Sequence, residues 1–158
     1  EQKSKVAEAG AETFAKEKSK KISELNESAG ALSSTLQGIG RMRQLGGFSS
    51  RLGVGKIGTK EYEEGQSIVE DTRLGFAKIK TGGVVTESDK KNAAAVIPDI
   101  TSWTERSDNK LNALEKRAKQ EYINKARAID PSTRNKRPSQ ILMEAGVRAT
   151  TDDDKELQ

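Results

Sequence analysis

The sequence predicts an all-α protein built from elongated helices with narrow apolar seams, a glycine-rich joint and an extended C-terminal tail. Apolar residues recur at alternating spacings of three and four along two long stretches, as they do on one face of a helix. Only 32% of the 158 residues are hydrophobic and 4% aromatic, too little for a thick globular core. Glycines and prolines gather between the periodic stretches, where they end helices. We therefore divide the chain into residues 1–45, 46–60, 61–130 and 131–158.

A long N-terminal helix is predicted over residues 1–45. Its apolar seam consists of Ile22, Leu25, Ala29, Leu32, Leu36, Ile39 and Met42. The positions between them are mostly polar, so the seam is narrow, as on a helix that packs against a partner. Gly30, Gly38 and Gly40 each weaken the helix by about 1 kcal/mol relative to Ala. We expect these glycines to admit the backbone of a neighbour.

Residues 46–60 form a glycine-rich linker with the sequence GGFSSRLGVGKIGTK. Basic residues bracket this linker, and no acidic residue lies between the first and the last of them. They are the candidate phosphate contacts Arg41, Arg43, Arg51, Lys56 and Lys60. Two interpretations stay open, a nucleic-acid contact and a solvated basic linker.

Residues 61–130 are expected to form a hairpin-like group of helices. A helix over residues 61–80 ends at a hinge formed by Gly82 and Gly83. A shorter helix starts at Thr86, which forms a capping box with Asp89. Pro98 stops this shorter helix because proline lacks a backbone N–H and restricts the residue before it.

The last long helix is predicted to start at Ser102, which forms a second capping box with Glu105, and to end at Asp130, just before Pro131. Its apolar seam consists of Leu111, Leu114, Ala118, Tyr122, Ala126 and Ile129. The narrow seam again predicts packing against a neighbouring helix.

Residues 131–158 are predicted to be an extended polar tail that depends on a partner. The stretch PSTRNKRPSQ is polar and bounded by prolines, and ILMEAGV supplies enough apolar residues for only one short helical turn. We expect the acidic run at residues 152–154 to be a solvated terminal charge.

The composition excludes several classes of chemistry. The chain has no Cys and no His, so it lacks thiolate metal sites, disulfides and the commonest general base. No apolar stretch approaches the roughly 20 residues needed to span a bilayer. The net charge of +4 permits contact with nucleic acid without requiring it. We predict no catalytic residue, no bound metal and no cofactor.

Three short motifs of the serine β-lactamases occur by coincidence. Lys80-Thr81-Gly82, Ser88-x-x-Lys91 and Ser107-Asp108-Asn109 lie within thirty residues of one another. Their order differs from that of the enzymes, and no strand pattern surrounds the first motif. Ser88 lies inside a charged capping box, where a lysine is solvated and unsuited to act as a base. A capped hinge between helices is therefore the better interpretation.

Four stretches between residues 66 and 127 follow a recurring order, LGFAKIKTG, GVVTESD, IPDIT and RSDNKLNALEKRA. This order resembles a pattern in virion-associated internal and DNA-ejection proteins of tailed phages. In that pattern a glycine turn, a "vS/TdxD" cap and an Ile-Pro precede a helix rich in Lys and Leu. The resemblance implies a mostly helical protein, attached to the capsid, portal or tail in multiple copies, that helps the genome to enter the host. A chain that opens at Glu1 fits a processed product or a segment of a longer protein.

We accordingly expect a non-catalytic structural protein, located in the virion, that contacts copies of itself and portal, tail or ejection proteins. These contacts are assigned to Ile22, Leu25, Leu32, Leu36, Ile39, Leu111, Leu114 and Tyr122. One alternative is a basic DNA-binding module that uses residues 41–60. A membrane-active N-terminal helix is a weaker alternative, because the seam lacks Trp and Phe.

Overall fold

The computed structural model describes residues 2–44, 60–97 and 107–158. These residues form α-helices and one 3-10 helix, with no β-strand among them, so the predicted all-α class is confirmed. In chain order the elements are α1 (Gln2–Gln44), α3 (Lys60–Thr81), α4 (Glu87–Val96), α5 (Ser107–Ile129), η3 (Pro131–Asn135), α6 (Pro138–Glu144) and α7 (Thr151–Glu156).

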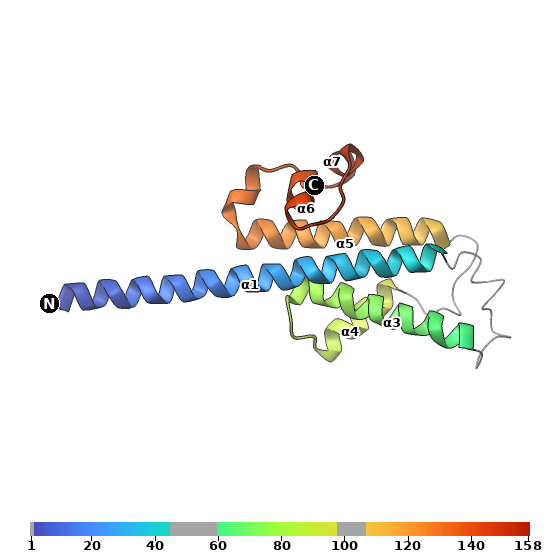
Figure 1. Ribbon diagram of the computed structural model, residues 1–158, viewed down its shortest axis with the longest axis horizontal. Helices are drawn as coiled ribbons and strands as arrows, with labels where there is room; N and C mark the ends of the chain where they lie inside the picture. The colour runs from blue at the N-terminus through green and yellow to red at the C-terminus, as the bar shows by residue number, and fades with distance from the viewer. Residues whose placement is uncertain (1, 45–59, 98–106) are drawn as a thin grey trace.

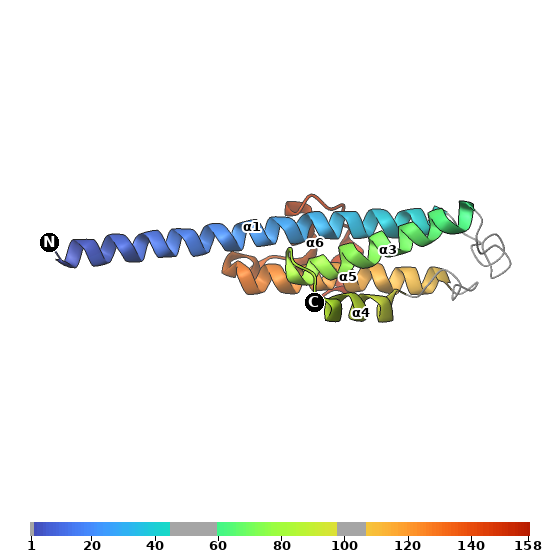
Figure 2. The same cartoon turned by 90° about the horizontal axis from the view of Figure 1, so that it is seen from below.

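The long helix α1 is the axis of the molecule. Its C-terminal half lies between α3 and α5, and α4 packs on α3 (Figure 1). The N-terminal part of α1 extends well beyond all the other helices, and the view turned by 90° shows the same projection (Figure 2). We call residues 2–23 the arm and the remaining described residues the body.

The body is held together by two apolar clusters along α1. One cluster joins α1, α3 and α5 to the C-terminal helices, and its fully buried members include Leu32, Ile79 and Ile123. The other surrounds Ile39 and Met42 near the C-terminal end of α1. Partly buried side chains from α1 and α3 border both clusters, so the two form one continuous core.

Small residues bring α1 and α3 into close contact. A Cβ atom added at Gly38 would lie 2.1 Å from Oγ1 of Thr72, and one added at Gly75 would lie 2.8 Å from Oγ1 of Thr35. Both threonine hydroxyls are buried and donate to carbonyl oxygens of their own helices, at 2.7 Å. The neighbour that Gly38 admits is therefore a helix of the same chain.

The predicted hinge after α3 is confirmed, and a lysine fixes it in place. Gly82 has a φ of 72°, in the left-handed region that favours glycine. Nζ of Lys125 donates to the carbonyl oxygen of Lys80 at 2.9 Å and lies 3.2 Å from Oε1 of Glu24. This contact joins α1, α5 and the C-terminal end of α3, where the partial negative charge of the helix favours a cation.

The predicted capping box at the start of α4 is also confirmed. The hydroxyl of Thr86 accepts from the backbone N–H of Asp89 at 3.2 Å, and the backbone N–H of Thr86 donates to the Asp89 carboxylate at 2.9 Å. The backbone N–H of Thr86 and its hydroxyl, which both donate to the Asp89 carboxylate, hold the pKa of Asp89 below its ordinary value. Pro98 and the second predicted capping box, Ser102 with Glu105, lie outside the described residues.

The prediction of an extended C-terminal tail is wrong. Residues 131–158 fold back along α5 as η3, α6 and α7 (Figure 1). Their apolar side chains enter the first cluster, and the buried ones are Ile141, Leu142, Val147 and Leu157. The prolines expected to keep the tail extended instead start short helices, because a proline fits the first helical turn. Gly146, with a φ of 80°, then turns the chain after α6.

The acidic run near the C-terminus holds the tail on the body and is not simply solvated. Lys119 on α5 forms an ion pair with Asp153 at 3.0 Å, and the two side chains are only 12% and 9% exposed. The carboxylate of Asp154 accepts from the backbone N–H of Ser139 at 2.9 Å and from its hydroxyl at 2.8 Å, which joins α7 to the start of α6. Two of the three aspartates therefore have structural partners.

Candidate functional site

The residues assigned to partner contacts lie mostly inside the body. Five are buried against other helices of the same chain, and these are Leu32, Ile39, Leu111, Leu114 and Tyr122. Leu25 and Leu36 are partly buried against the same core, whereas Ile22 is 50% exposed. The assignment of these seams to oligomer contacts is therefore corrected, because α1 and α5 bury them against each other and α3. Of the eight, Ile22 leaves the most surface for a partner.

Three of the five predicted phosphate contacts lie in the described residues, and one of them is engaged within the chain. The guanidinium of Arg43 is 2.7 Å from both Oδ1 of Asn112 and Oε2 of Glu115, so it is engaged within the chain. Arg41 is exposed near the end of α1, and Lys60 is exposed at the start of α3. Arg51 and Lys56, with the glycine-rich linker, lie outside the described residues.

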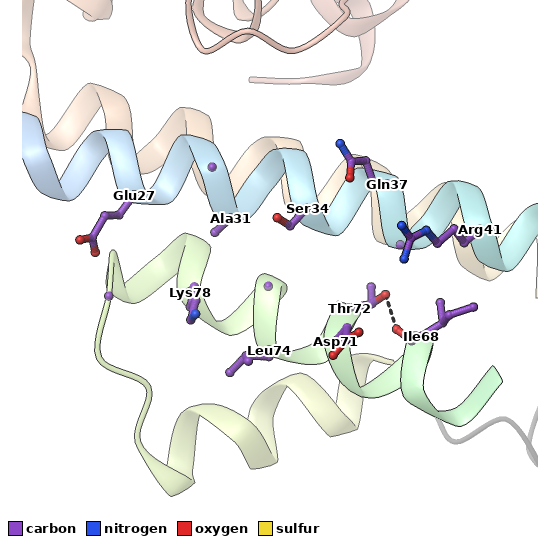
Figure 3. Close-up of a pocket in the computed structure, with 14 residues that line it drawn as sticks. Glu27, Ala31, Ser34, Gln37, Arg41, Ile68, Asp71, Thr72, Leu74 and Lys78 are labelled. Atoms are coloured by element: carbon purple, nitrogen blue, oxygen red, sulfur yellow. Dashed lines mark hydrogen bonds between the residues drawn. The ribbon is translucent and has the colours of Figure 1, made fainter. Parts of the chain in front are cut away.

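An open groove of about 840 Å³ runs between α1 and α3 (Figure 3). Gly30, Ser34 and Gly38 line it from α1, and Asp71 and Leu74 are among the lining residues of α3. A Cβ atom added at Gly30 would meet nothing within 4 Å, so this glycine leaves open space. The groove is a product of small side chains on both helices.

The groove carries mixed charges and no assembled catalytic group. Arg41 lies near one end and Glu27 near the other, with Asp71 and Lys78 on α3 (Figure 3). In the described part of the chain no hydrogen bond joins Ser34 to a carboxylate or an amine that would activate it. The arrangement is that of a solvated trough between two packed helices.

The residues of the β-lactamase-like motifs also have helical surroundings. Thr81 ends α3, and its hydroxyl donates to the carbonyl oxygen of Ala77 at 3.4 Å. Ser88 is exposed in the first turn of α4, and Lys90 beside it forms an exposed ion pair with Glu87 at 3.3 Å. The first two motifs therefore lie on a capped hinge between α3 and α4, and Ser107-Asp108-Asn109 forms the first turn of α5.

In residues 2–44, 60–97 and 107–158, no group of three or more acidic, His or Cys side chains is arranged to hold a metal ion. No helix in those ranges combines the length and the apolar character that crossing a bilayer requires.

The arm is the most distinctive surface of the molecule. Every residue from 10 to 23 is exposed, including the apolar Phe14, which is 69% exposed, and Ile22. Phe14 precedes Leu25 by eleven residues, about three helical turns, so both lie on the same face of α1. Within the body that face packs against α5 and the core (Figure 1). The arm therefore continues a packed face after its partner helix has ended.

The end of α5 lies beside the inner part of the arm. The hydroxyl of Ser132, and to a smaller extent its backbone N–H, donates to the Asp130 carboxylate, and these hydrogen bonds hold the pKa of Asp130 below its ordinary value. The charges of Lys136 and of Lys18 on the arm lower this pKa further. An acidic group at the end of α5 is thus within electrostatic reach of a lysine on the arm.

The sequence contains a signal for the arm in the helical spacing upstream of the predicted seam. The predicted seam started at Ile22, but the helical spacing continues upstream through Lys18 to Phe14. The lysine interrupts the apolar pattern, so the predicted seam begins only at Ile22. Burial alone distinguishes the two parts of the face, and burial depends on where α5 ends.

Comparison with known proteins identifies no relative. No family model, no curated protein and no solved structure matches the chain.

Proposed function

We propose that this chain is a non-catalytic structural component of a tailed-phage virion, attached to the capsid, portal or tail, and that the arm makes its principal contact with other virion proteins. The observation that carries the proposal is the arm itself, a helix that stands free of the body with Phe14 and Ile22 exposed on one face. Exposed apolar side chains that continue a packed face are typical of protein contact sites.

The body supports this proposal because it stabilises the helix from which the arm extends. At about 1.5 Å per residue the arm is about 33 Å long. A free helix is only marginally stable in water, because its first turn is costly to form. Here α1 is already nucleated within the body, where α3 and α5 hold its C-terminal half. The arm is thereby presented at a defined angle.

Mass spectrometry of purified particles tests the assignment. We expect the chain among the particle proteins in several copies, and we expect loss of the arm, by deletion of residues 2–23, to remove it from particles while the body still folds. The chain in infected-cell extracts but absent from particles would overturn the proposal.

The DNA-binding alternative has a different signature. If residues 41–60 contact phosphates, affinity for duplex DNA falls steeply with rising salt and falls again when Arg41 is replaced by Ala. Deletion of the arm would leave that affinity unchanged. Anisotropy titrations with labelled duplex DNA at two salt concentrations separate the two functions.

A further inference from the structure

The way α1 pairs with α5 indicates what the arm would bind. Along this pairing an apolar stripe is accompanied by opposite charges on the two helices. Arg43 on α1 lies 2.7 Å from Glu115 on α5, and Glu24 on α1 lies 3.2 Å from Lys125 on α5. The charge of Lys18 on the arm acts on Asp130, at the end of α5. Two charges of α1 beside the stripe are thus paired with opposite charges of α5, and a third acts on an acidic group just after α5.

The inner part of the arm has an excess of positive charge that no ion pair of the described residues neutralises. Residues 15–23 contain four lysines, Lys16, Lys18, Lys20 and Lys21, and a single glutamate, Glu17. All of these side chains are exposed, and no ion pair within the described residues engages any of the four lysines at 4 Å or less. A partner on this surface gains most if it supplies carboxylates.

The position of Lys18 makes the preference specific to a protein helix. Lys18 lies four residues after Phe14 and four before Ile22, so it is on the apolar face of the arm. A lipid surface would bury the apolar face and leave this ammonium among acyl chains. A helix that packs on the same face can place a carboxylate next to Lys18, whose charge already acts on Asp130 just after the end of α5.

A second copy of this chain fits the arm less well. Over residues 10–23 four lysines outnumber two glutamates, so two arms laid against each other repel. A parallel pairing is also blocked, because α5 already occupies the face along which the second α1 would continue (Figure 1).

We infer that the arm is a docking helix for an acidic amphipathic helix of another protein. Apolar side chains of that partner cover Phe14 and Ile22, and its carboxylates lie against Lys18 and Lys21. The partner continues the line of α5 beyond Ile129, so that α1 packs on one face over most of its length. This inference rests on the proposed function and identifies the chemistry of the partner.

Three synthetic helical peptides provide the probe. They share one pattern of leucines at spacings of three and four and differ only in the flanking residues, which are all Glu, all Gln or all Lys. We expect the full-length chain to bind the Glu peptide at least tenfold more tightly than the Gln peptide, and the Lys peptide more weakly still, in anisotropy titrations at physiological salt. Equal binding of all three, or binding of none, would overturn the inference.

Three variants locate the contact. Lys18→Glu is expected to weaken binding of the Glu peptide at least tenfold and to strengthen binding of the Lys peptide, whereas Phe14→Ala weakens both. Lys91→Glu is the matched control, because Lys91 is exposed on α4 and far from the arm in sequence. An equal loss in the control, self-association of the chain alone, or binding of phosphatidylserine vesicles that competes with the peptide would each contradict the inference.

The peptide result is independent of the assignment to a virion. Failure of all three peptides would remove the acidic helix as the partner and leave the particle experiment to decide the function. Absence of the chain from particles would leave a measured charge preference of the arm intact.

Discussion

The two ends of the chain are both polar, but only the C-terminal end packs against the body. The arm exposes Phe14 and Ile22, whereas the C-terminal tail buries Leu142 and Leu157 in the core. The tail is joined to α5 by a tight turn and is broken into short helices by prolines and Gly146, so it folds back onto the surface that it has just left. The arm contains no proline and continues a rigid helix in a straight line.

This difference shows that a count of apolar residues does not decide whether a terminal segment packs. A segment must also contain turns that carry its apolar residues back to the body. The tail has such turns and the arm does not. What remains exposed at the N-terminus is therefore a consequence of helix continuity.

The strongest test replaces one buried residue of the tail and one exposed residue of the arm. Leu142→Ala is expected to lower the free energy of unfolding by about 2–5 kcal/mol, because Leu142 is 0% exposed and its removal leaves a cavity. Phe14→Ala is expected to change it by less than about 0.5 kcal/mol. Urea unfolding followed by circular dichroism measures both, and equal effects would contradict the comparison.

The ion pair that holds the tail gives the next largest effect. Asp153→Asn removes the nearer of the two carboxylates that pair with the poorly exposed ammonium of Lys119 and leaves Glu115 at 3.6 Å, so it is expected to cost roughly 2 kcal/mol. Asp152→Asn is the control, because Asp152 is exposed in the same helix. If both variants lose the same stability, the tail is held by its apolar residues alone.

The cap of α4 provides a smaller reference effect, one that depends on local sequence. Thr86→Ala removes the hydroxyl that accepts from the N–H of Asp89 and is expected to cost about 1 kcal/mol. Ser88→Ala, in the same turn but outside the capping box, should cost little. A larger loss for Ser88, or a loss of hydrolytic activity on its replacement, would restore the catalytic interpretation.

Low pH should loosen the tail gradually. The backbone N–H of Ser139, and to a smaller extent its hydroxyl, donates to the Asp154 carboxylate. These hydrogen bonds lower the pKa of Asp154 from an ordinary value of 3.8. A lowered pKa in the folded state means that this carboxylate adds stability above pH 3.8, and the contribution is lost as the pH falls through the lowered pKa. The Asp154→Asn variant should therefore lose less stability than the native chain between pH about 6 and about 3. Urea titrations of both chains at each pH measure this loss. If the variant and the native chain lose the same free energy of unfolding, Asp154 does not contribute to the pH dependence.

Local sequence determined several features of this protein. The periodic seams predicted α1 and α5. The hinge at Gly82 followed from the absence of a side chain, and the Thr86 cap followed from a hydroxyl and a carboxylate three residues apart. Each depends on neighbours within about one helical turn, so the sequence alone suffices.

Only the tertiary structure decided which apolar faces are used up inside the chain. Tyr122 and Leu32 belong to seams whose spacing alone predicts contacts with a partner protein. In the structure, helices far away in the sequence bury both side chains. The prediction of an extended tail was wrong because its four buried apolar side chains contribute stability only when they pack on α5 and the core. Phe14 remains exposed because α5 ends beside the inner part of the arm and covers none of its outer part. The point where one helix ends relative to another is set by packing over long distances in the chain.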